Sequence, residues 1–352
     1  MGAPKPWPTR WPEPSEIPDL DSDDKPLEAP DYDIEEFPSE NPIEPPYQLP
    51  EERLVPYSVT WGVTHACNLH CTTCYDVVNY KRHSLNTAEA LTVIDRLASI
   101  GISFIVFAGG EPLVRKDLYQ LMAHCRTRNI GIGLRSNGVL ITTGVARRLA
   151  ELELAVVGVS LDGATEQSHD EIRGQGSFQR TIAGINQLLA ANIRVNLEVV
   201  LSRRNAPFCL QFVRFAESLG VQEINFSALA PQGRAEQLMS QDVLDHELWR
   251  ELTTTLYKAS LTANVAVSPS CALTGTCWSC VEPNITCDGW VTPCYLSKRK
   301  LFHILDTPPQ VVKAYLQENR PATLNICGRE RWRKPEKIKA NKFSPFSLTE
   351  QY

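Results

Sequence analysis

From Tyr57 onward, short runs of apolar residues alternate with longer segments in which apolar residues recur every three or four positions. The short runs predict β-strands, and the longer segments predict amphipathic helices. The predicted strands cover residues 57–64, 102–107, 130–135, 155–160, 193–201 and 222–229. The predicted helices cover residues 87–99, 117–128, 143–152, 178–191 and 207–219. Strands joined by helices in this order form a parallel sheet with right-handed connections, so the fold class is α/β.

The helix predicted at 87–99 shows the pattern most clearly. Thr87 is expected to be its N-cap, and Glu89 lies in its first turn. One face then carries Ala90, Leu91, Ile94, Leu97 and Ala98. This face is expected to pack on the sheet.

Polar residues, glycines and a cysteine follow the predicted strands at the points where they end. They are Cys67 after the first strand, Gly109, Gly110 and Glu111 after the second, Ser136 and Asn137 after the third, and Ser160 at the end of the fourth. In parallel barrels, ligands bind where the strands end. These residues are therefore expected to meet on one rim.

Three cysteines, Cys67, Cys71 and Cys74, lie in the run Thr64-His-Ala-Cys-Asn-Leu-His-Cys-Thr-Thr-Cys-Tyr75. Thiolates at this spacing can bind one face of a [4Fe–4S] cluster, which takes four ligands. One iron would then stay open for an exchangeable ligand. Zinc is the competing metal, but structural zinc sites use paired motifs, and no such partner lies nearby in the sequence.

The order CxxxCxxC, Gly109-Gly-Glu-Pro112, Ser136-Asn-Gly138, Ser160-Leu-Asp-Gly163 and His169-Asp-Glu-Ile-Arg-Gly174 resembles the radical S-adenosylmethionine (SAM) superfamily, over roughly residues 57–230. The resemblance implies a partial (β/α)6 TIM-type barrel. It also implies a [4Fe–4S] cluster on Cys67, Cys71 and Cys74, with SAM as its exchangeable ligand.

In such a protein, SAM would bind the open iron through its amino and carboxylate groups. The resemblance places Gly109, Gly110 and Glu111 at the amine, and Ser136, Asn137, Ser160 and Arg173 near the ribose and carboxylate. The chain departs from the family pattern at Thr73, where an aromatic residue usually precedes the third cysteine. Tyr75 lies two residues further on.

A second group of cysteines follows the barrel, at Cys271, Cys277, Cys280, Cys287, Cys294 and Cys327. Cys277, Gly289 and Cys294 resemble the CX9–15GX4C signature of SPASM and twitch extensions. This resemblance implies a small Cys-rich C-terminal auxiliary-cluster domain with a second [4Fe–4S] cluster. Asp288-Gly289 predicts a hairpin turn. The expected ligands are Cys277, Cys280, Cys294 and Cys327, with Cys287 and Cys271 as alternatives to Cys280, and zinc as the alternative metal.

Composition predicts the organisation outside the barrel. Residues 1–50 contain 13 acidic and 3 basic residues and 13 of the 25 prolines. Such a segment buries little, so residues 1–55 are expected to form an extended or disordered arm, which either stays solvated or docks on the basic body. The expected divisions are then the barrel at 56–235, the auxiliary cluster region at 236–335 and a basic tail at 336–352.

Length and cysteine pattern exclude other classes. No apolar run approaches the ~20 residues of a membrane span, and no signal segment is recognised at the start. Clustered cysteines in such a chain predict metal ligands in the cytoplasm rather than disulfides of a secreted protein. We expect no nucleic-acid partner.

The resemblance implies an oxidoreductase that generates a 5′-deoxyadenosyl radical, with a one-electron donor such as flavodoxin or ferredoxin as partner. The strings Trp61-Gly-Val-Thr-His-Ala-Cys-Asn-Leu69 and Val157-Gly-Val-Ser-Leu-Asp-Gly163 resemble enzymes that modify tetrapyrroles, and also peptide maturases. The expected substrate is a tetrapyrrole or other small biosynthetic intermediate. The alternatives are maturation of a ribosomal peptide (RiPP) and a non-enzymatic iron–sulfur electron carrier.

Overall fold

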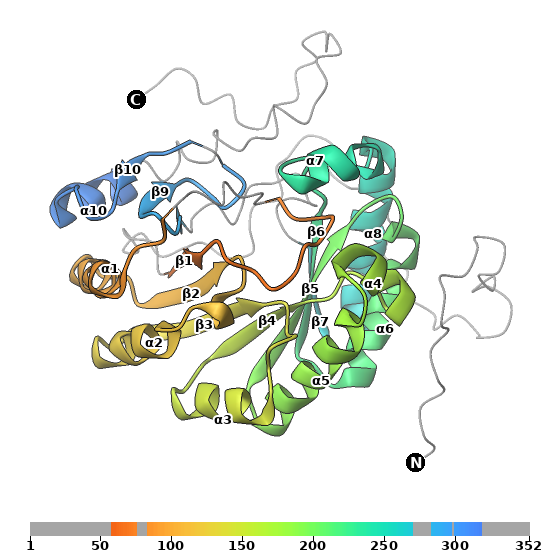
Figure 1. The fold of residues 1–352 in the computed structure, drawn as a ribbon. Helices are drawn as coiled ribbons and strands as arrows, with labels where there is room; N and C mark the ends of the chain where they lie inside the picture. The colour runs from red at the N-terminus through yellow and green to blue at the C-terminus, as the bar shows by residue number, and fades with distance from the viewer. Residues whose placement is uncertain (1–57, 76–82, 270–282, 298, 319–352) are drawn as a thin grey trace, which may run out of the picture. The chain divides into compact units, whose positions relative to one another are not determined.

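A curved sheet forms the centre of the molecule (Figure 1). The computed structural model describes residues 58–75, 83–269, 283–297 and 299–318, all of which belong to one structural unit. The strands lie in the order β10-β9-β8-β1-β2-β3-β4-β5-β6-β7, and neighbours from β1 to β7 are parallel. Their bounds are β1 Ser58–Thr64, β2 Phe104–Gly109, β3 Gly131–Ser136, β4 Val156–Ser160, β5 Arg194–Leu201, β6 Glu223–Ala228, β7 Ala266–Pro269, β8 Asn284–Ile285, β9 Trp290–Thr292 and β10 Phe302–His303.

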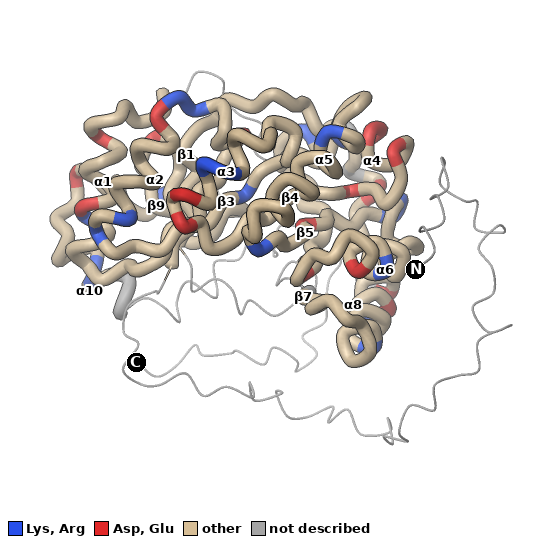
Figure 2. The backbone as a smooth tube through the Cα atoms, turned by 90° about the horizontal axis from the view of Figure 1, so that it is seen from below, with Lys and Arg blue, Asp and Glu red and all other residues tan. Residues whose placement is uncertain are grey.

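Helices connect the parallel strands and cover the convex side of the sheet (Figure 1). The described helices are α1 Thr87–Ser99, α2 Leu118–Thr127, α3 Thr143–Glu151, α4 Glu166–Arg173, α5 Ser177–Ala190, α6 Cys209–Leu219, α7 Arg234–Leu238, α8 His246–Thr262 and α10 Pro309–Glu318; of these, α7 lies at the strand ends and α10 follows the last strand. Short 3-10 turns lie at Pro112–Val114, Ala206–Phe208 and Ser240–Asp242. Acidic and basic residues are interspersed over the helices (Figure 2).

Alternation along each strand separates the two faces of the sheet. On β3 the side chains of Ile132 and Leu134 are buried in the core against the helices, and on β4 those of Val157 and Val159. Successive residues of a strand point to opposite faces, so Arg135 and Gly158 lie on the concave face. The helices bury one apolar face, and the concave face carries polar side chains such as Arg135 beside apolar ones such as Phe104, whose ring lies over Gly133.

The expected fold class is confirmed. All six predicted strands and all five predicted helices are present, with ends within about two residues of those expected. The sheet continues beyond the six strands, because β7 pairs with β6, and β8 pairs in parallel with β1. The expected arm at 1–55 and tail at 336–352 lie outside the described residues. No helix in the described ranges has the length and apolar character to cross a membrane.

The predicted N-cap of the first helix was wrong by one residue. Asn86 caps α1, and Thr87 is the first helical residue. The Asn86 side chain accepts a hydrogen bond from the Glu89 amide (3.0 Å), and the Glu89 carboxylate accepts one from the Asn86 amide (2.8 Å). These reciprocal bonds form a capping box, which satisfies two amides that the helix itself leaves without partners.

We expect Asn86→Ala to destabilise the fold by about 1 kcal/mol, because it removes the capping acceptor. The measurement is urea unfolding followed by circular dichroism. Asn86→Asp is the matched control, since aspartate caps as well as asparagine. Equal destabilisation by both variants would contradict the role of the cap.

Candidate functional site

The three cysteines Cys67, Cys71 and Cys74 lie on the loop that follows β1. None forms a disulfide; Cys67 is exposed and the other two are partly buried. The Leu69 amide donates to Cys67 Sγ (3.4 Å). Although Cys67 is exposed at the surface, the surrounding chain partly desolvates its sulfur, which raises the pKa of that thiol against the opposing effect of this hydrogen bond. The loop therefore presents three thiols at the end of the sheet where strands β1 to β4 finish.

The glycines after β2 pack directly against this loop. The Gly110 amide donates to the Thr64 carbonyl, and the Glu111 amide donates to the Ala66 carbonyl, both at 2.8 Å. A Cβ at Gly109 would lie 2.4 Å from the Thr64 oxygen, and one at Gly110 would lie 2.3 Å from the Ala66 oxygen. Any larger residue would push the two segments apart. The glycine pair thus holds the start of the cysteine loop against β2.

The Glu111 carboxylate is fully buried and lies among hydrogen-bond donors. It accepts from the Leu113 amide (3.1 Å), the Ser136 hydroxyl (3.0 Å) and the Asn137 amide (2.8 Å). Burial raises its pKa, and these hydrogen bonds oppose that rise. The Asn137 side chain in turn donates to Asn68 Oδ1 (2.8 Å) on the cysteine loop. Glu111 therefore fixes the turn after β3 relative to the cysteine loop.

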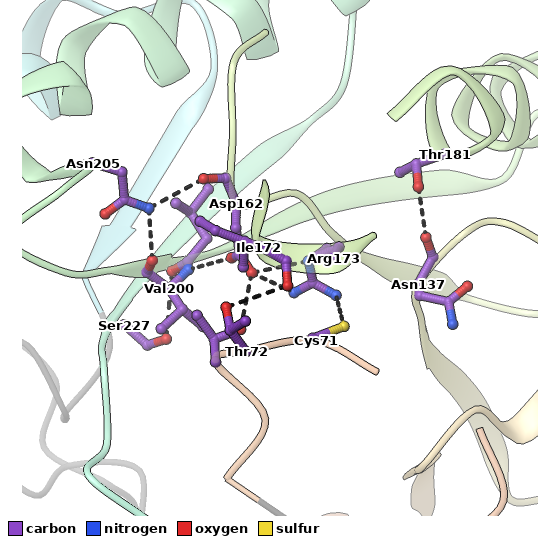
Figure 3. Close-up of polar contacts among 12 residues, drawn as sticks. Cys71, Thr72, Asn137, Asp162, Ile172, Arg173, Thr181, Val200, Asn205 and Ser227 are labelled. Atoms are coloured by element: carbon purple, nitrogen blue, oxygen red, sulfur yellow. Dashed lines mark hydrogen bonds and ion pairs between the residues drawn. The ribbon is translucent and has the colours of Figure 1, made fainter. Parts of the chain in front are cut away.

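A second buried carboxylate, Asp162, holds the other side of the loop (Figure 3). Asp162 Oδ2 accepts from Arg173 Nε (2.9 Å) at the end of α4 and from the Thr73 hydroxyl (3.3 Å). Asp162 Oδ1 accepts from the Val200 amide (2.9 Å) on β5. Arg173 Nη1 lies 4.0 Å from Cys71 Sγ. The nearby Asp162 charge raises the pKa of Arg173 against the opposing effect of burial.

The structure brings most of the expected site residues together. Gly109, Gly110, Glu111, Ser136 and Asn137 form one connected group beside Cys67, and Ser160 ends β4 at the same edge. Arg173 faces Cys71 and the loop. The roles of these residues toward SAM stay predictions.

Sequence reasoning missed the central position of Asp162 and the partnership of Thr73. The aspartate stands in the Ser-Leu-Asp-Gly motif directly after a predicted strand, and this placement was the available signal. Thr73, noted as a departure from the family pattern, is buried and bonded to Asp162. It anchors the loop through its hydroxyl.

The hairpin expected in the second cysteine group is present. β8 and β9 pair antiparallel, and the Gly289 amide donates to the Thr286 carbonyl (2.9 Å) across the turn. Gly289 has a φ of +83°, which favours glycine. Cys287 is buried in this turn, and Cys294 follows β9 in a partly buried position. Cys271, Cys277, Cys280 and Cys327 lie outside the described residues.

The cysteine loop after β1 lies beside the segment that follows Cys294. The rings of Tyr75 and Tyr295, which each follow a cysteine, are 5.4 Å apart. Arg234 Nη1 donates to the Cys71 carbonyl (2.7 Å), and Gln232 Nε2 donates to the Leu296 carbonyl (3.1 Å). Residues 232–234 thus contact both the cysteine loop and the segment after Cys294.

Residues 61–205 match the family model described as the radical SAM superfamily. This range contains the cysteine loop, both buried carboxylates and strands β2 to β5. A parallel α/β sheet with a three-cysteine loop at the strand ends defines the class. The predicted resemblance is confirmed for this part of the chain: residues 61–205 form a radical SAM domain.

Curated relatives differ in the substrates that their names state. The AdoMet-dependent heme synthase of Oleidesulfovibrio alaskensis is 31% identical over 217 residues, covering 61% of this chain and 56% of that protein. The mycofactocin maturase MftC of Mycobacterium tuberculosis is 35% identical over 181 residues, covering 51% and 46%. The chain spans about half the length of these relatives.

Solved structures share the fold. The SuiB protein of Streptococcus suis bound to its precursor peptide SuiA aligns with a TM-score of 0.62 at 14% identity, over 75% of this chain and 65% of that chain. Native anSMEcpe with bound AdoMet aligns with a TM-score of 0.61 at 19% identity, over 76% and 82%.

We expect Asp162→Ala to destabilise the protein by about 3–5 kcal/mol, because it leaves the buried Arg173 charge without its partner. Chemical denaturation monitored by tryptophan fluorescence measures this loss. Arg128→Ala is the control, since its pair with Asp95 is exposed and should cost at most ~1 kcal/mol. Comparable losses in the two variants would show that the buried pair does not hold the loop.

Proposed function

We propose that this protein is a radical SAM enzyme that oxidatively modifies an unactivated C–H position of a biosynthetic substrate. The observation that carries the proposal is the loop of Cys67, Cys71 and Cys74, fixed on one side by Glu111 and on the other by Asp162. With a reduced [4Fe–4S] cluster and SAM bound, this chemistry supplies a 5′-deoxyadenosyl radical that abstracts hydrogen. The protein's own task is to position the reacting groups and exclude competing donors.

The residues present fit an iron–sulfur cluster. Three thiols without disulfide partners lie on one loop, and Arg173 and the Asn137 amide lie 4.0 Å from Cys71 Sγ and Cys67 Sγ. Donors near sulfur stabilise the charge of cluster-bound thiolates. No three His, Cys, Asp or Glu side chains of the described residues converge on a single metal ion. Zinc on the same cysteines is the alternative metal.

The SAM site is proposed at the adjoining strand ends. Gly109, Gly110 and Glu111 would hold the amine, with Ser136, Asn137, Ser160 and Arg173 toward the ribose and carboxylate. The burial of Glu111 among three donors supports a role in shaping this region. The guanidinium of Arg173 suits a carboxylate, and Asp162 fixes its direction.

A second [4Fe–4S] cluster is proposed on Cys277, Cys280, Cys294 and Cys327. Of these, Cys294 lies in the described part of the chain and directly precedes Tyr295, whose ring contacts Tyr75 beside Cys74. Cys287 and Cys271 are the alternatives to Cys280. A cluster at this place would be near enough to the first to accept the electron that remains on an oxidised substrate.

Two substrate classes are proposed: a tetrapyrrole, since one relative is named heme synthase, or a peptide, the class to which the sequence strings quoted above also point. Either would need a one-electron donor such as flavodoxin or ferredoxin. We propose cytoplasmic action, where reduced clusters persist. The competing function is that of an electron carrier without SAM chemistry. Such a carrier would not need the hydrogen bonds that surround Glu111.

We expect the anaerobically reconstituted protein to hold two [4Fe–4S] clusters. Replacing Cys67, Cys71 and Cys74 together by alanine should remove about half the iron and abolish SAM cleavage, because each cluster depends on its own thiolates. Iron and sulfide analysis, with detection of 5′-deoxyadenosine after dithionite reduction, measures both effects. Cys125→Ala is the control, since Cys125 is buried in α2. Intact SAM cleavage in the triple variant would refute the proposed function.

We expect Cys294→Ala to spare SAM cleavage and stop product formation, because the auxiliary cluster would no longer accept the substrate electron. The ratio of 5′-deoxyadenosine to product, measured by mass spectrometry, should rise. A normal ratio would remove the auxiliary cluster from the reaction and leave the first cluster's role untouched.

A further inference from the structure

The concave face of the sheet carries a charged pair that the cluster and SAM sites do not use. Arg135 on β3 and Glu198 on β5 reach toward each other across β4, with Arg135 Nε 3.2 Å from Glu198 Oε1. Their side chains remain 37% and 32% exposed. An ion pair on this face lies on the side of the sheet opposite the helices, so it contributes nothing to packing the apolar core.

Glycine in the intervening strand makes room for the pair. Arg135 pairs in register with Gly158, and Gly158 pairs with Asn196 on β5. Glu198 Oε1 lies 2.6 Å from the position that a Cβ would take at Gly158. The carboxylate therefore rests directly over the β4 backbone. A larger residue at 158 would displace the carboxylate.

Beside the pair, the side-chain oxygen of Asn196 accepts no hydrogen bond from the described residues. Its Nδ2 donates to Glu223 Oε2 (2.9 Å), which fixes the amide with Oδ1 free on the other side. Among the described residues, Asn196 Oδ1 is buried and has no hydrogen-bond partner. A buried acceptor without a partner costs free energy. A donor from a bound molecule would remove that cost.

Arg135 and Glu198 are neighbours, in sequence or in strand register, of residues at the proposed cluster and SAM sites. Arg135 directly precedes Ser136 and Asn137, which bond to Glu111 and Asn68. Glu198 is in register with Ser160 at the end of β4, and its carbonyl accepts from the Leu161 amide (2.9 Å) next to Asp162. A molecule held by the pair would therefore lie on the concave face, beneath the strand ends that carry the cysteine loop.

We propose that Arg135 and Glu198 bind the substrate, and that the substrate is a peptide. The proposal rests on the radical SAM function above and names its substrate class. The Arg135 guanidinium would donate to a carbonyl oxygen, and the Glu198 carboxylate would accept from a neighbouring N–H. Asn196 Oδ1 would accept a further N–H. Adjacent acceptors and donors of this kind are what a peptide backbone offers.

The alternative substrate, a tetrapyrrole with several carboxylates, fits this surface less well. A carboxylate that approaches Arg135 also meets the like charge of Glu198, which opposes its binding. Neutralising Glu198 should therefore change the affinities of the two substrate classes in opposite directions. Neutralising Glu198 weakens a peptide that donates to it, and strengthens a molecule that carries only carboxylates.

The experiment uses the full-length protein, reconstituted anaerobically and supplied with SAM. Peptides that bind are selected from a random-sequence library, and their dissociation constants are measured by fluorescence anisotropy. A free-base porphyrin tetracarboxylate is the second probe. Arg135→Gln and Glu198→Gln should each weaken peptide binding roughly 10–100-fold, as expected for loss of a charge-assisted hydrogen bond.

Arg147→Gln is the matched control. Arg147 forms an exposed pair with Glu151 (3.8 Å) on α3, and its loss should leave peptide binding unchanged. The exchange variant Arg135→Glu/Glu198→Arg keeps an ion pair, and so guards against a mere folding defect. It should retain the melting temperature and lose peptide affinity.

Failure of the proposal differs from failure of the proposed function. Formation of 5′-deoxyadenosine should persist in all four variants, and its absence in the wild type would refute the radical SAM function. Unchanged peptide affinity in Arg135→Gln and Glu198→Gln would overturn the binding role of the pair. A wild type that retains no peptide, with tighter porphyrin binding in Glu198→Gln, would overturn the peptide assignment.

Discussion

The carboxylate of Asp162 is the point on which the site depends. It receives hydrogen bonds from the cysteine loop through Thr73, from α4 through Arg173 and from β5 through the Val200 amide. The backbone carbonyl of the same residue accepts from Asn205 Nδ2 (3.1 Å). Four separate segments are thus fixed by one buried residue. The Arg173 charge that faces Cys71 has Asp162 as its buried partner, and without that partner it would be left uncompensated.

The buried carboxylate of Glu111 is stabilised by hydrogen bonds and not by an ion pair like that of Asp162. Its donors are two backbone amides and a hydroxyl, and none of them carries a charge. Burial raises the pKa of Glu111 and these hydrogen bonds oppose the rise, whereas Asp162 has a guanidinium beside it. The two carboxylates hold opposite sides of the cysteine loop, and the loop is positioned before any ligand binds. Because the loop is already ordered, less conformational entropy is lost when a ligand binds.

The core of this fold could be predicted from sequence because its signals are local. Strands β1 to β6 are apolar runs, and their helices carry an apolar stripe, so both appeared within about two residues of their true ends. β8 and β10 have two residues each, too few to show any period. Their place beside β1 and β9 follows from tertiary pairing that no local pattern encodes.

The candidate site was likewise predictable from the sequence only in part. Motif order predicted which residues meet at the rim, because strand ends of a parallel sheet converge. The partners of each side chain could not be predicted, since they depend on distances between segments far apart in the chain. Thr73 illustrates the difference: its hydroxyl bonds to an aspartate 89 positions away. The Arg135–Glu198 pair was missed because both residues look like ordinary charges inside apolar strands.

Pairing of β8 with β1 has a consequence for the order in which the chain can fold. Thr60 in the first strand pairs with Asn284, so the edge of β1 is closed by a segment made much later in synthesis. Until that segment emerges, β1 presents unpaired backbone groups to other chains. Contacts of such wide sequence separation also form slowly. The cysteine loop begins at the end of this strand, and the loop therefore gains its full support only when nearly all of the described chain has been synthesised.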